Sequence, residues 1–397
     1  MLETYIVYTI ILVTILTSSY YISILTQTAP SNLPGHSISN RVNDTRYVIL
    51  ASIPILVYSI IEGFRYDVGV DFMQNRLIFE YMQQGNLYRT EIDPLYLWII
   101  RFLALVGFES PVLFIITSFL FIFSLYFLLR EKKHLVLFAA PMYLLYSLYA
   151  ENLIRQFFAI GLLVIGLSYL LKNKYAIFLL FAIPAFFIHS SCIIAIFTYL
   201  MIYIFYKKLL NIKLIFILIA YLISWYVGTA VIEGLKPLVL FFNYMGLMLN
   251  YTDYVDSLLD NTRVDLFFNA SIFGNAFHFA RNLFLLIFGY KLLRKYPNRH
   301  YIFFYFIFVL YAITKPMFSR HELFDRLIHY LEILLPVLIG YMGYDVFKMK
   351  RKNLLVSIAL RGAVIVIILF NIYSYYGGIN NNAKRMNHGF LFVWDKR

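Results

Sequence analysis

Residues 47–72, YVILASIPILVYSIIEGFRYDVGVDF, run from an apolar stretch into a group of charged residues. The apolar part, 47–63, has the length and composition of a short membrane-spanning helix, which needs about 17–25 predominantly apolar residues. Arg65, Asp67 and Asp71 follow it directly. Charged side chains are costly inside a bilayer and therefore mark either a polar site or the membrane surface. This stretch predicts a transmembrane helix that ends in one of these two environments.

The composition of the whole chain supports a membrane assignment. Of its 397 residues, 61% are hydrophobic and 14% are charged, whereas soluble globular domains are about 25% charged. We predict an all-α polytopic integral membrane protein with about 10–13 transmembrane helices. Because no change of composition divides the chain, residues 1–397 are predicted to form a single multi-pass membrane domain. The candidate spans are 5–26, 47–63, 110–130, 134–151, 155–171, 174–189, 191–206, 213–233, 278–294, 301–318, 325–346 and 354–376.

The basic residues predict which loops are cytoplasmic. The net charge is +13, and Lys and Arg gather in short clusters between apolar stretches, as they do in the cytoplasmic loops of membrane proteins. A basic arm or nucleic-acid motif is missing, so no nucleic-acid partner is expected. With the clusters in the cytoplasm, 64–93 and 234–277 become external segments, and 94–108 becomes a re-entrant or interfacial helix. The clusters lie at 130–134, 172–174, 206–213, 291–299 and 348–353.

This topology places four polar groups, far apart in the sequence, on the external face. They lie within 65–71, 151–156, 189–191 and 320–326. Topology signals alone do not require such a gathering. We therefore expect a polar cavity on the external (periplasmic) face.

The first group, around Arg65, allows two interpretations. In one, Arg65 binds an anion while an aspartate orients or deprotonates a hydroxyl group. In the other, Arg65 forms an ion pair with Asp67 or Asp71 at the membrane surface. Gly69 lies between the charges and permits a tight turn that directs side chains inward.

The second group has the i, i+3, i+4 spacing of residues on one helical face, at Asn152, Arg155 and Gln156. An arginine can bind a phosphate through two parallel hydrogen bonds, and amides can bind sugar hydroxyls. The alternative is a solvated loop between two spans.

The third and fourth groups carry a candidate base and another arginine. A neutral imidazole at His189 can act as a general base near neutral pH, although a lone histidine among apolar residues is also typical of a core position. Glu322, Arg326 and Tyr330 lie along one helical stripe. Arg326 can bind an anion or pair internally with Glu322.

Several motifs are missing from the sequence. It contains no P-loop, no HExxH and no GxSxG motif, which argues against ATP hydrolysis, zinc proteolysis and serine-hydrolase chemistry. The single cysteine, Cys192, excludes an intramolecular disulfide. We expect neither a cofactor nor a metal ion.

The order of these motifs resembles that of the EpsG family, which belongs with the Wzy-type polysaccharide polymerases. The resemblance covers about residues 45–210 well and the rest loosely. Three positions depart from the family pattern: Val70 replaces Thr, Phe72 replaces Tyr, and Asp93 replaces the Glu before Pro94. Asp93 keeps the acidic character of its position, and the other residues that carry the resemblance are Arg65, Gly69, Asp71, Pro94, Leu95, Tyr96, Ile154, Arg155, Gln156, Ala159, Ala185, His189, Ser190, Arg326 and Tyr330.

The resemblance implies a glycosyltransferase in the bacterial cytoplasmic (inner) membrane with its active site facing the periplasm or exterior. It would join repeat units of O-antigen, capsule or exopolysaccharide, with undecaprenyl-diphosphate-linked oligosaccharide as donor and acceptor. Membrane lipids and a chain-length regulator protein are further expected partners. On this basis the diphosphate-binding residues are Arg65, Arg155 and Arg326, the candidate bases are His189 and then Asp71, and the sugar-binding residues are Asn152, Gln156, Tyr330 and Glu322.

Two alternatives remain open from the sequence. An O-antigen ligase-like enzyme, or another glycosyltransferase acting on lipid-linked sugars, would use similar external arginines and a histidine. A transporter of polysaccharide or lipid-linked oligosaccharide would instead place charges near the bilayer midplane and show two related halves.

Overall fold

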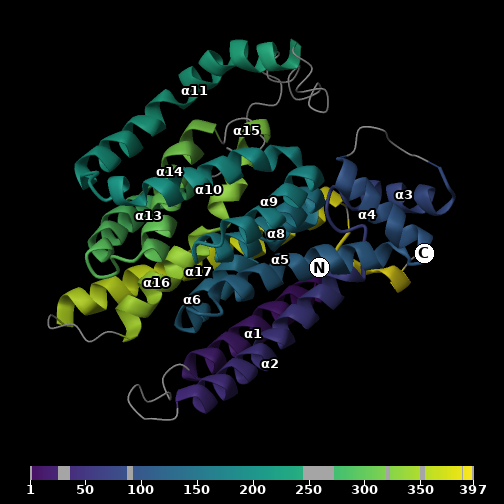
Figure 1. Cartoon of the computed structure of the whole chain (residues 1–397), viewed down its shortest axis with the longest axis horizontal. Coiled ribbons are helices and arrows are strands. Elements are labelled where there is room, and N and C mark those ends of the chain that lie inside the picture. The colour runs from purple at the N-terminus through teal and green to yellow at the C-terminus, as the bar shows by residue number, and fades with distance from the viewer. Residues whose placement is uncertain are drawn as a thin grey trace. The chain divides into compact units, whose positions relative to one another are not determined.

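The computed structural model describes residues 2–25, 36–86, 93–244, 272–318, 322–348, 354–386 and 388–395. These residues are almost entirely helical (Figure 1). They divide into two compact units, one made of Met1–Cys192 with Ile339–Arg397 and the other of Ile193–Leu338. The single membrane domain over 1–397 stays a prediction.

The first unit contains most of the elements that concern the candidate site. Its helices and strands are α1 (Leu2–Leu25), α2 (His36–Gly63), β1 (Arg65–Tyr66), α3 (Phe72–Gln83), α4 (Pro94–Leu105), α5 (Ser110–Leu129), η1 (Lys133–Leu135), α6 (Val136–Leu144), α7 (Ser147–Asn152), α8 (Ile154–Leu170), α9 (Tyr175–Ile188), η2 (Ser190–Cys192), α17 (Leu354–Met386), β2 (Leu391–Phe392) and η4 (Val393–Asp395). The second unit contains α10 (Ile193–Leu209), α11 (Leu214–Tyr244), α13 (Ile272–Leu293), α14 (Arg299–Phe318) and α15 (Glu322–Glu332), and α16 (Leu335–Lys348) continues from it into the first unit.

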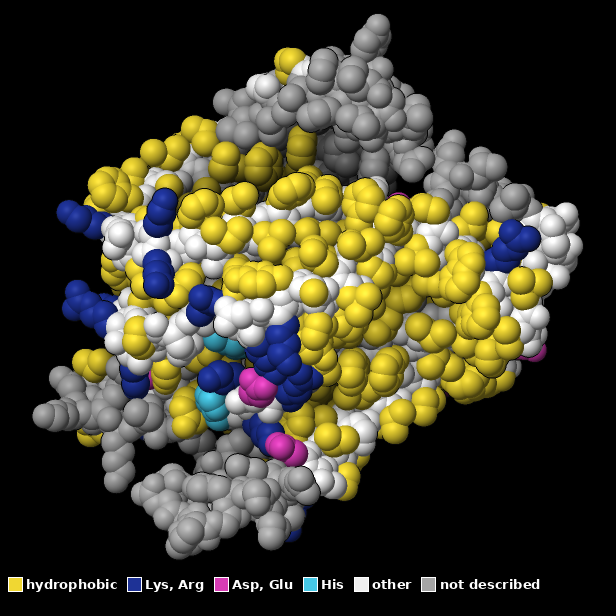
Figure 2. Space-filling view, in the orientation of Figure 1, with side chains coloured by type: hydrophobic (Ala, Val, Ile, Leu, Met, Phe, Trp, Pro, Cys, Tyr) yellow, Lys and Arg dark blue, Asp and Glu magenta, His cyan; other side chains and the backbone are white. Residues whose placement is uncertain are grey.

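The predicted all-α polytopic membrane fold is confirmed. Seven helical stretches in the described part of the chain are long and apolar enough to cross a membrane, and four shorter apolar helices accompany them. The seven are Leu2–Leu25, Asp44–Gly63, Ser110–Leu129, Ser190–Leu209, Arg299–Phe318, Phe324–Phe347 and Leu354–Lys384. Hydrophobic side chains, in yellow, form a broad area of the described surface in Figure 2, as expected of a protein surrounded by lipid.

Within the described residues, several of the predicted spans form short or divided helices. The expected span at 134–151 is divided into α6 and α7, and α8 and α9 have 17 and 14 residues. The predicted re-entrant or interfacial helix is α4, whose 12 residues extend about 18 Å at 1.5 Å per residue, too short to cross the hydrocarbon core. Residues 245–271 of the predicted external segment 234–277 lie outside the described residues, and its first part belongs to α11.

Helix α5 forms the centre of the first unit. It packs against α2 on one side and α8 on another, while α8 packs in turn against α9. Helices α2 and α9 run toward the end of the unit at which α5 and α8 begin. Loops near residues 63, 110, 153 and 189 therefore meet at one end of this bundle, where three of the four predicted polar groups lie.

The C-terminal segment fastens onto this end of the first unit. Strand β2 pairs antiparallel with β1, with Arg65 opposite Phe392. The backbone N–H of Val393 donates to the carbonyl of Phe64 at 2.9 Å, and His388 Nε2 lies 3.1 Å from Asp67 Oδ2. Segment 64–70 is thus held by residues from the far end of the sequence.

A tight turn at Gly69 completes this attachment. Gly69 has φ +96°, and a Cβ atom there would lie only 2.3 Å from the carbonyl oxygen of Glu151. The N–H of Gly69 faces Met386 Sδ at 3.2 Å, and the N–H of Val70 donates to Asn152 Oδ1 at 2.9 Å. Only glycine satisfies both the backbone conformation and the close approach of α7.

We expect Gly69→Ala to destabilise the protein more than Gly85→Ala does. Both positions have positive φ, but a Cβ at Gly85 (φ +78°) would meet nothing within 4 Å. Gly85→Ala should cost about 1–2 kcal/mol from its backbone conformation alone, and Gly69→Ala should cost more because α7 must also move. Thermal unfolding of the two detergent-purified variants checks this, and equal melting temperatures would contradict it.

Candidate functional site

Asp93 joins two of the predicted polar groups in the first unit. Its carboxylate Oδ2 accepts a long hydrogen bond from Arg155 Nη1 at 3.5 Å and lies 3.7 Å from His189 Nδ1. Its Oδ1 accepts from the backbone N–H of Ser190 at 3.3 Å. Residues at the start of α4, the start of α8 and the end of α9 therefore meet around one carboxylate.

The local sequence explains why Asp93 reaches outward. Pro94 occupies the first turn of α4 and restricts the preceding residue to an extended conformation, observed as φ −52° and ψ 132°. An aspartate in this N-cap position usually accepts hydrogen bonds from its own helix. The Asp93 side chain makes no such bond, and its oxygens face α8 and η2 instead.

His189 and Arg155 differ in their access to solvent. His189 is the C-cap residue of α9 with an extended backbone, and its side chain is 12% exposed. The Arg155 side chain is 32% exposed, so its guanidinium contacts Asp93 and also reaches the surface. An acidic group beside Nδ1 favours proton exchange at Nε2, the arrangement in which a carboxylate orients a histidine base.

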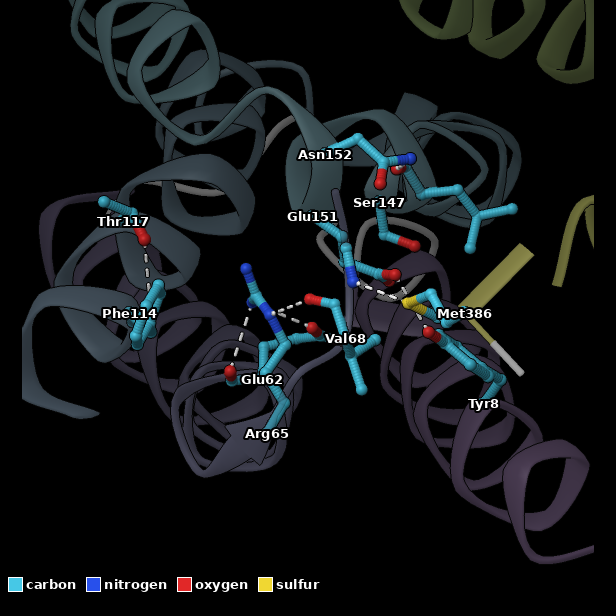
Figure 3. A network of polar contacts seen from close by, with 12 residues as sticks. Tyr8, Glu62, Arg65, Val68, Phe114, Thr117, Ser147, Glu151, Asn152 and Met386 are labelled. Atoms are coloured by element: carbon cyan, nitrogen blue, oxygen red, sulfur yellow. Dashed lines mark hydrogen bonds and ion pairs between the residues drawn. The ribbon is translucent and has the colours of Figure 1, made fainter. Parts of the chain in front are cut away.

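Arg65 lies in a different environment from Arg155. Its side chain is 2% exposed, and its Nη1 donates to the Glu62 carboxylate at 3.1 Å, while its Nε donates to the carbonyl of Val68 at 3.1 Å (Figure 3). Its guanidinium also lies 5.2 Å from the centre of the Phe114 ring. Of the two interpretations of this group, the one that pairs Arg65 with Asp67 or Asp71 is wrong, because the partner is Glu62, three residues earlier. Protein groups enclose Arg65, so we leave it out of the proposed diphosphate contacts.

A second buried acid lies close to this ion pair. Glu62 is 0% exposed, and the second acid, Glu151, is 1% exposed and accepts a hydrogen bond from Tyr8 Oη at 3.0 Å. Figure 3 shows these groups between α1, α2 and α7. They join the N-terminal helix to the polar end of the bundle.

The remaining predicted residues of the first unit have structural partners. Asn152 belongs to α7, whereas Arg155 and Gln156 belong to α8, because Leu153 (φ −121°, ψ 54°) interrupts the helix. The prediction that these three residues share one helical face was therefore wrong. Gln156 is buried, and Asp71 is the N-cap residue of α3, where its carbonyl accepts from Asn75.

The second unit contains its own buried polar network. Tyr330 is buried in α15 and its carbonyl accepts a hydrogen bond from Tyr199. Arg326 also lies in α15, and the Glu322 side chain lies outside the described part. Lys315 donates to Asp325 at 2.7 Å and lies 3.7 Å from Glu332 Oε2.

The sequence interpretation did not single out Lys315 or Glu332. Glu332 also accepts a hydrogen bond from Tyr311 Oη at 3.0 Å and lies 3.4 Å from His329. Charged residues within apolar helices are the signal that would have found them. Among the described residues, no group of three or more His, Cys, Asp or Glu side chains is placed to hold a metal ion.

The fold and the site together define a class of protein. It is a multi-pass helical membrane protein in which a carboxylate, an arginine and a histidine gather at one end of a helix bundle. A family model matches residues 48–387, and the chain belongs to the EpsG family. This membership links it to exopolysaccharide biosynthesis. Neither the comparison with curated proteins nor that with solved structures gave a match.

We expect Arg65→Met to destabilise the protein and Glu62→Gln to restore part of the loss. Removing one partner of a buried ion pair leaves an uncompensated charge and costs about 3–5 kcal/mol. The double variant removes that charge as well. Thermal unfolding of the two single variants and the double variant gives the coupling between the two side chains, and strictly additive losses would contradict an internal role for Arg65.

Proposed function

We propose that this protein is a glycosyltransferase that polymerises repeat units carried on undecaprenyl diphosphate, with its reaction centre at Asp93, Arg155 and His189. Membership of the EpsG family supports the pathway. The observation that carries the site is the contact of one carboxylate with a guanidinium and an imidazole from separate helices. The centre would face the outside of the bacterial cytoplasmic membrane.

The reaction breaks the bond between the anomeric carbon of the donor chain and its diphosphate oxygen. The acceptor hydroxyl oxygen forms the new glycosidic bond, its proton passes to His189 Nε2, and undecaprenyl diphosphate leaves with the bonding electrons. The donor already contains its leaving group, so the chemistry needs no nucleotide. General-base assistance of this kind typically contributes about 10²–10⁴-fold to the rate.

Arg155 is suited to the charge that develops on the leaving diphosphate. A fixed cation in a poorly hydrated site stabilises such charge strongly. Its contact with Asp93 is long, at 3.5 Å, so the guanidinium can exchange that contact for a phosphate oxygen. Asp93 then has a positioning role, because it holds the imidazole and the loop of Ser190 without touching the reacting atoms itself.

The other predicted site residues keep narrower roles in this proposal. Asp71 is the alternative base, and Arg326 remains a predicted diphosphate-binding residue. Asn152, Gln156, Glu322 and Tyr330 remain predicted sugar contacts. A chain-length regulator protein remains a predicted partner.

We expect His189→Ala and Arg155→Ala to abolish the polymer ladder in a host that lacks its own polymerase. Each removes a group worth about 100-fold or more in rate, so single repeat units should accumulate on the lipid. Gel electrophoresis of the extracted polysaccharide gives the measurement. Lys172→Ala is the matched control, since Lys172 follows the opposite end of α8 and pairs with Glu131.

The same gels separate a ligase from a polymerase, because loss of a ligase leaves long polymer on undecaprenyl diphosphate. A transporter is separated by labelling intact cells from outside, because single units that accumulate after loss of a transporter stay on the cytoplasmic face and are not labelled. Normal ladders from both His189→Ala and Arg155→Ala would contradict the proposed site.

We expect Asp93→Asn to lose most of the activity and Asp93→Glu to keep part of it. The amide of Asp93→Asn cannot neutralise Arg155 or an imidazolium at His189. Glutamate supplies a carboxylate and is the residue usual at this position in the EpsG family. Ladder intensity, normalised to the amount of folded protein in the membrane, distinguishes the two. Equal activity of both variants would contradict a positioning role for the charge.

A further inference from the structure

A cavity lies at the same end of the first unit, and the sequence interpretation did not anticipate it. Its volume is about 540 Å³, and it is formed by the start of α5, by α3, by residues 64–72 and by residues 393–394 of the C-terminal segment. Ligand-binding pockets commonly have volumes of about 300–1,000 Å³. None of the residues of the Asp93 group lines it.

Aromatic rings form much of the wall of this cavity. Trp394 is 66% exposed, yet it is held by Phe392, whose ring stacks on it at a centroid distance of 4.7 Å and an angle of 7°. The ring of Phe64, the residue before β1, lies 5.9 Å from the ring of Trp394, which belongs to η4. Tyr66 and Phe114 also line the cavity. An exposed ring fixed by stacking presents a rigid flat surface to a ligand.

The polar side chains of the cavity come from α3 and the start of α5. Arg76 Nε donates to Glu80 Oε1 at 2.6 Å, and the Arg76 guanidinium lies 4.9 Å from the centre of the Tyr66 ring. Glu109 is the N-cap residue of α5 and makes no capping bond with its own helix. Gln83 and Ser110 also line the cavity. These groups can donate to and accept from hydroxyls at several points.

The charge balance argues against an anionic ligand. The cavity contains one arginine and two glutamates, a formal charge of 1 − 2 = −1. A diphosphate would be repelled, whereas a neutral sugar or an amino sugar would not. Sugars present C–H groups on the faces of the ring, which pack on aromatic rings, and hydroxyls at the edges, which bind carboxylates and amides.

We propose that this cavity binds neutral or amino-sugar residues of the glycan chain, apart from the place where the lipid diphosphate is bound. The inference rests on the proposed function for the identity of the glycan. The C-terminal segment acquires a role from it, because the pairing of β2 with β1 is what places Trp394 beside Phe64. A site of this kind retains the growing chain between successive transfers.

Binding can be measured without catalysis. The probe is a set of oligosaccharides obtained by partial acid hydrolysis of exopolysaccharide from cells that carry this protein, titrated calorimetrically into the detergent-purified chain. We expect saturable binding that weakens at least tenfold in Trp394→Ala and in Glu109→Gln. Trp98→Ala is the matched control, because Trp98 is similarly exposed, at 60%, and does not line the cavity.

Three outcomes of the titration overturn the inference. They are no binding to the wild-type chain, equal loss in Trp98→Ala and Trp394→Ala, and displacement of the oligosaccharides by inorganic pyrophosphate at equal concentration. Glu109→Gln is a conservative change at an exposed position and should leave the melting temperature unchanged, so loss of binding in that variant is not a folding defect.

Asp93→Asn separates this inference from the proposed function. It should bind the oligosaccharides as the wild type does while losing the polymer ladder. Normal ladders in Asp93→Asn would remove the proposed reaction centre and leave the binding site intact. Absence of binding, with ladders that still depend on Asp93, would remove the cavity alone.

In cells, Trp394→Ala and Glu109→Gln should shorten the ladder while single-unit consumption continues, since a chain that is not retained dissociates after fewer transfers. A ladder of unchanged length in both variants would overturn the retention role.

Discussion

The buried ion pair between Arg65 and Glu62 is the interaction on which the polar end of this protein depends. It forms where α2 leaves the apolar region, and Arg65 also binds the carbonyl of Val68 in the following turn. A guanidinium so placed cannot be left without its partner, since an isolated buried charge is far more costly than a paired one. The pair therefore fixes the direction of the chain after α2. The turn at Gly69, the contact with α7 and the pairing of β1 with β2 follow from that direction.

The polar end of the bundle contains two arginines that differ in burial and in how firmly their partners hold them. Arg65 is enclosed, whereas Arg155 is partly exposed and has a long contact with Asp93. A cation that must exchange its partner for a ligand cannot be held as firmly as one that maintains the fold. The sequence alone did not distinguish the two arginines. Their burial does, because it indicates a structural role for Arg65 and a role in the proposed reaction for Arg155.

Apolar length and composition were enough to predict the helical membrane fold, because each span is a property of a continuous stretch. They did not predict the interruption at Leu153, which lies within a run of residues that favour helix, nor the pairing of Glu62, which reads as the end of an apolar span. The gathering of 65–71, 151–156 and 189–191 at one end followed from alternation of the helices. The position of Asp93 between Arg155 and His189 depends on the packing of α4 against α9, and no local pattern encodes it. The aromatic cavity could not be predicted for the same reason, since Trp394 and Phe64 are far apart in the sequence and meet only in the folded chain.

The attachment of the C-terminal segment also bears on how the protein is made. The Thr4 hydroxyl accepts a hydrogen bond from the backbone N–H of Phe390, 386 residues later in the sequence. The Asp67 carboxylate contacts His388, 321 residues later. Chains are synthesised from the N-terminus and begin to fold as they emerge, so these contacts wait until residues 388–390 have been made. Segment 64–70 therefore enters the membrane region early but acquires its last contacts late. A chain truncated before residue 388 would carry the seven long apolar stretches of the described residues but would lack the strand that secures this segment.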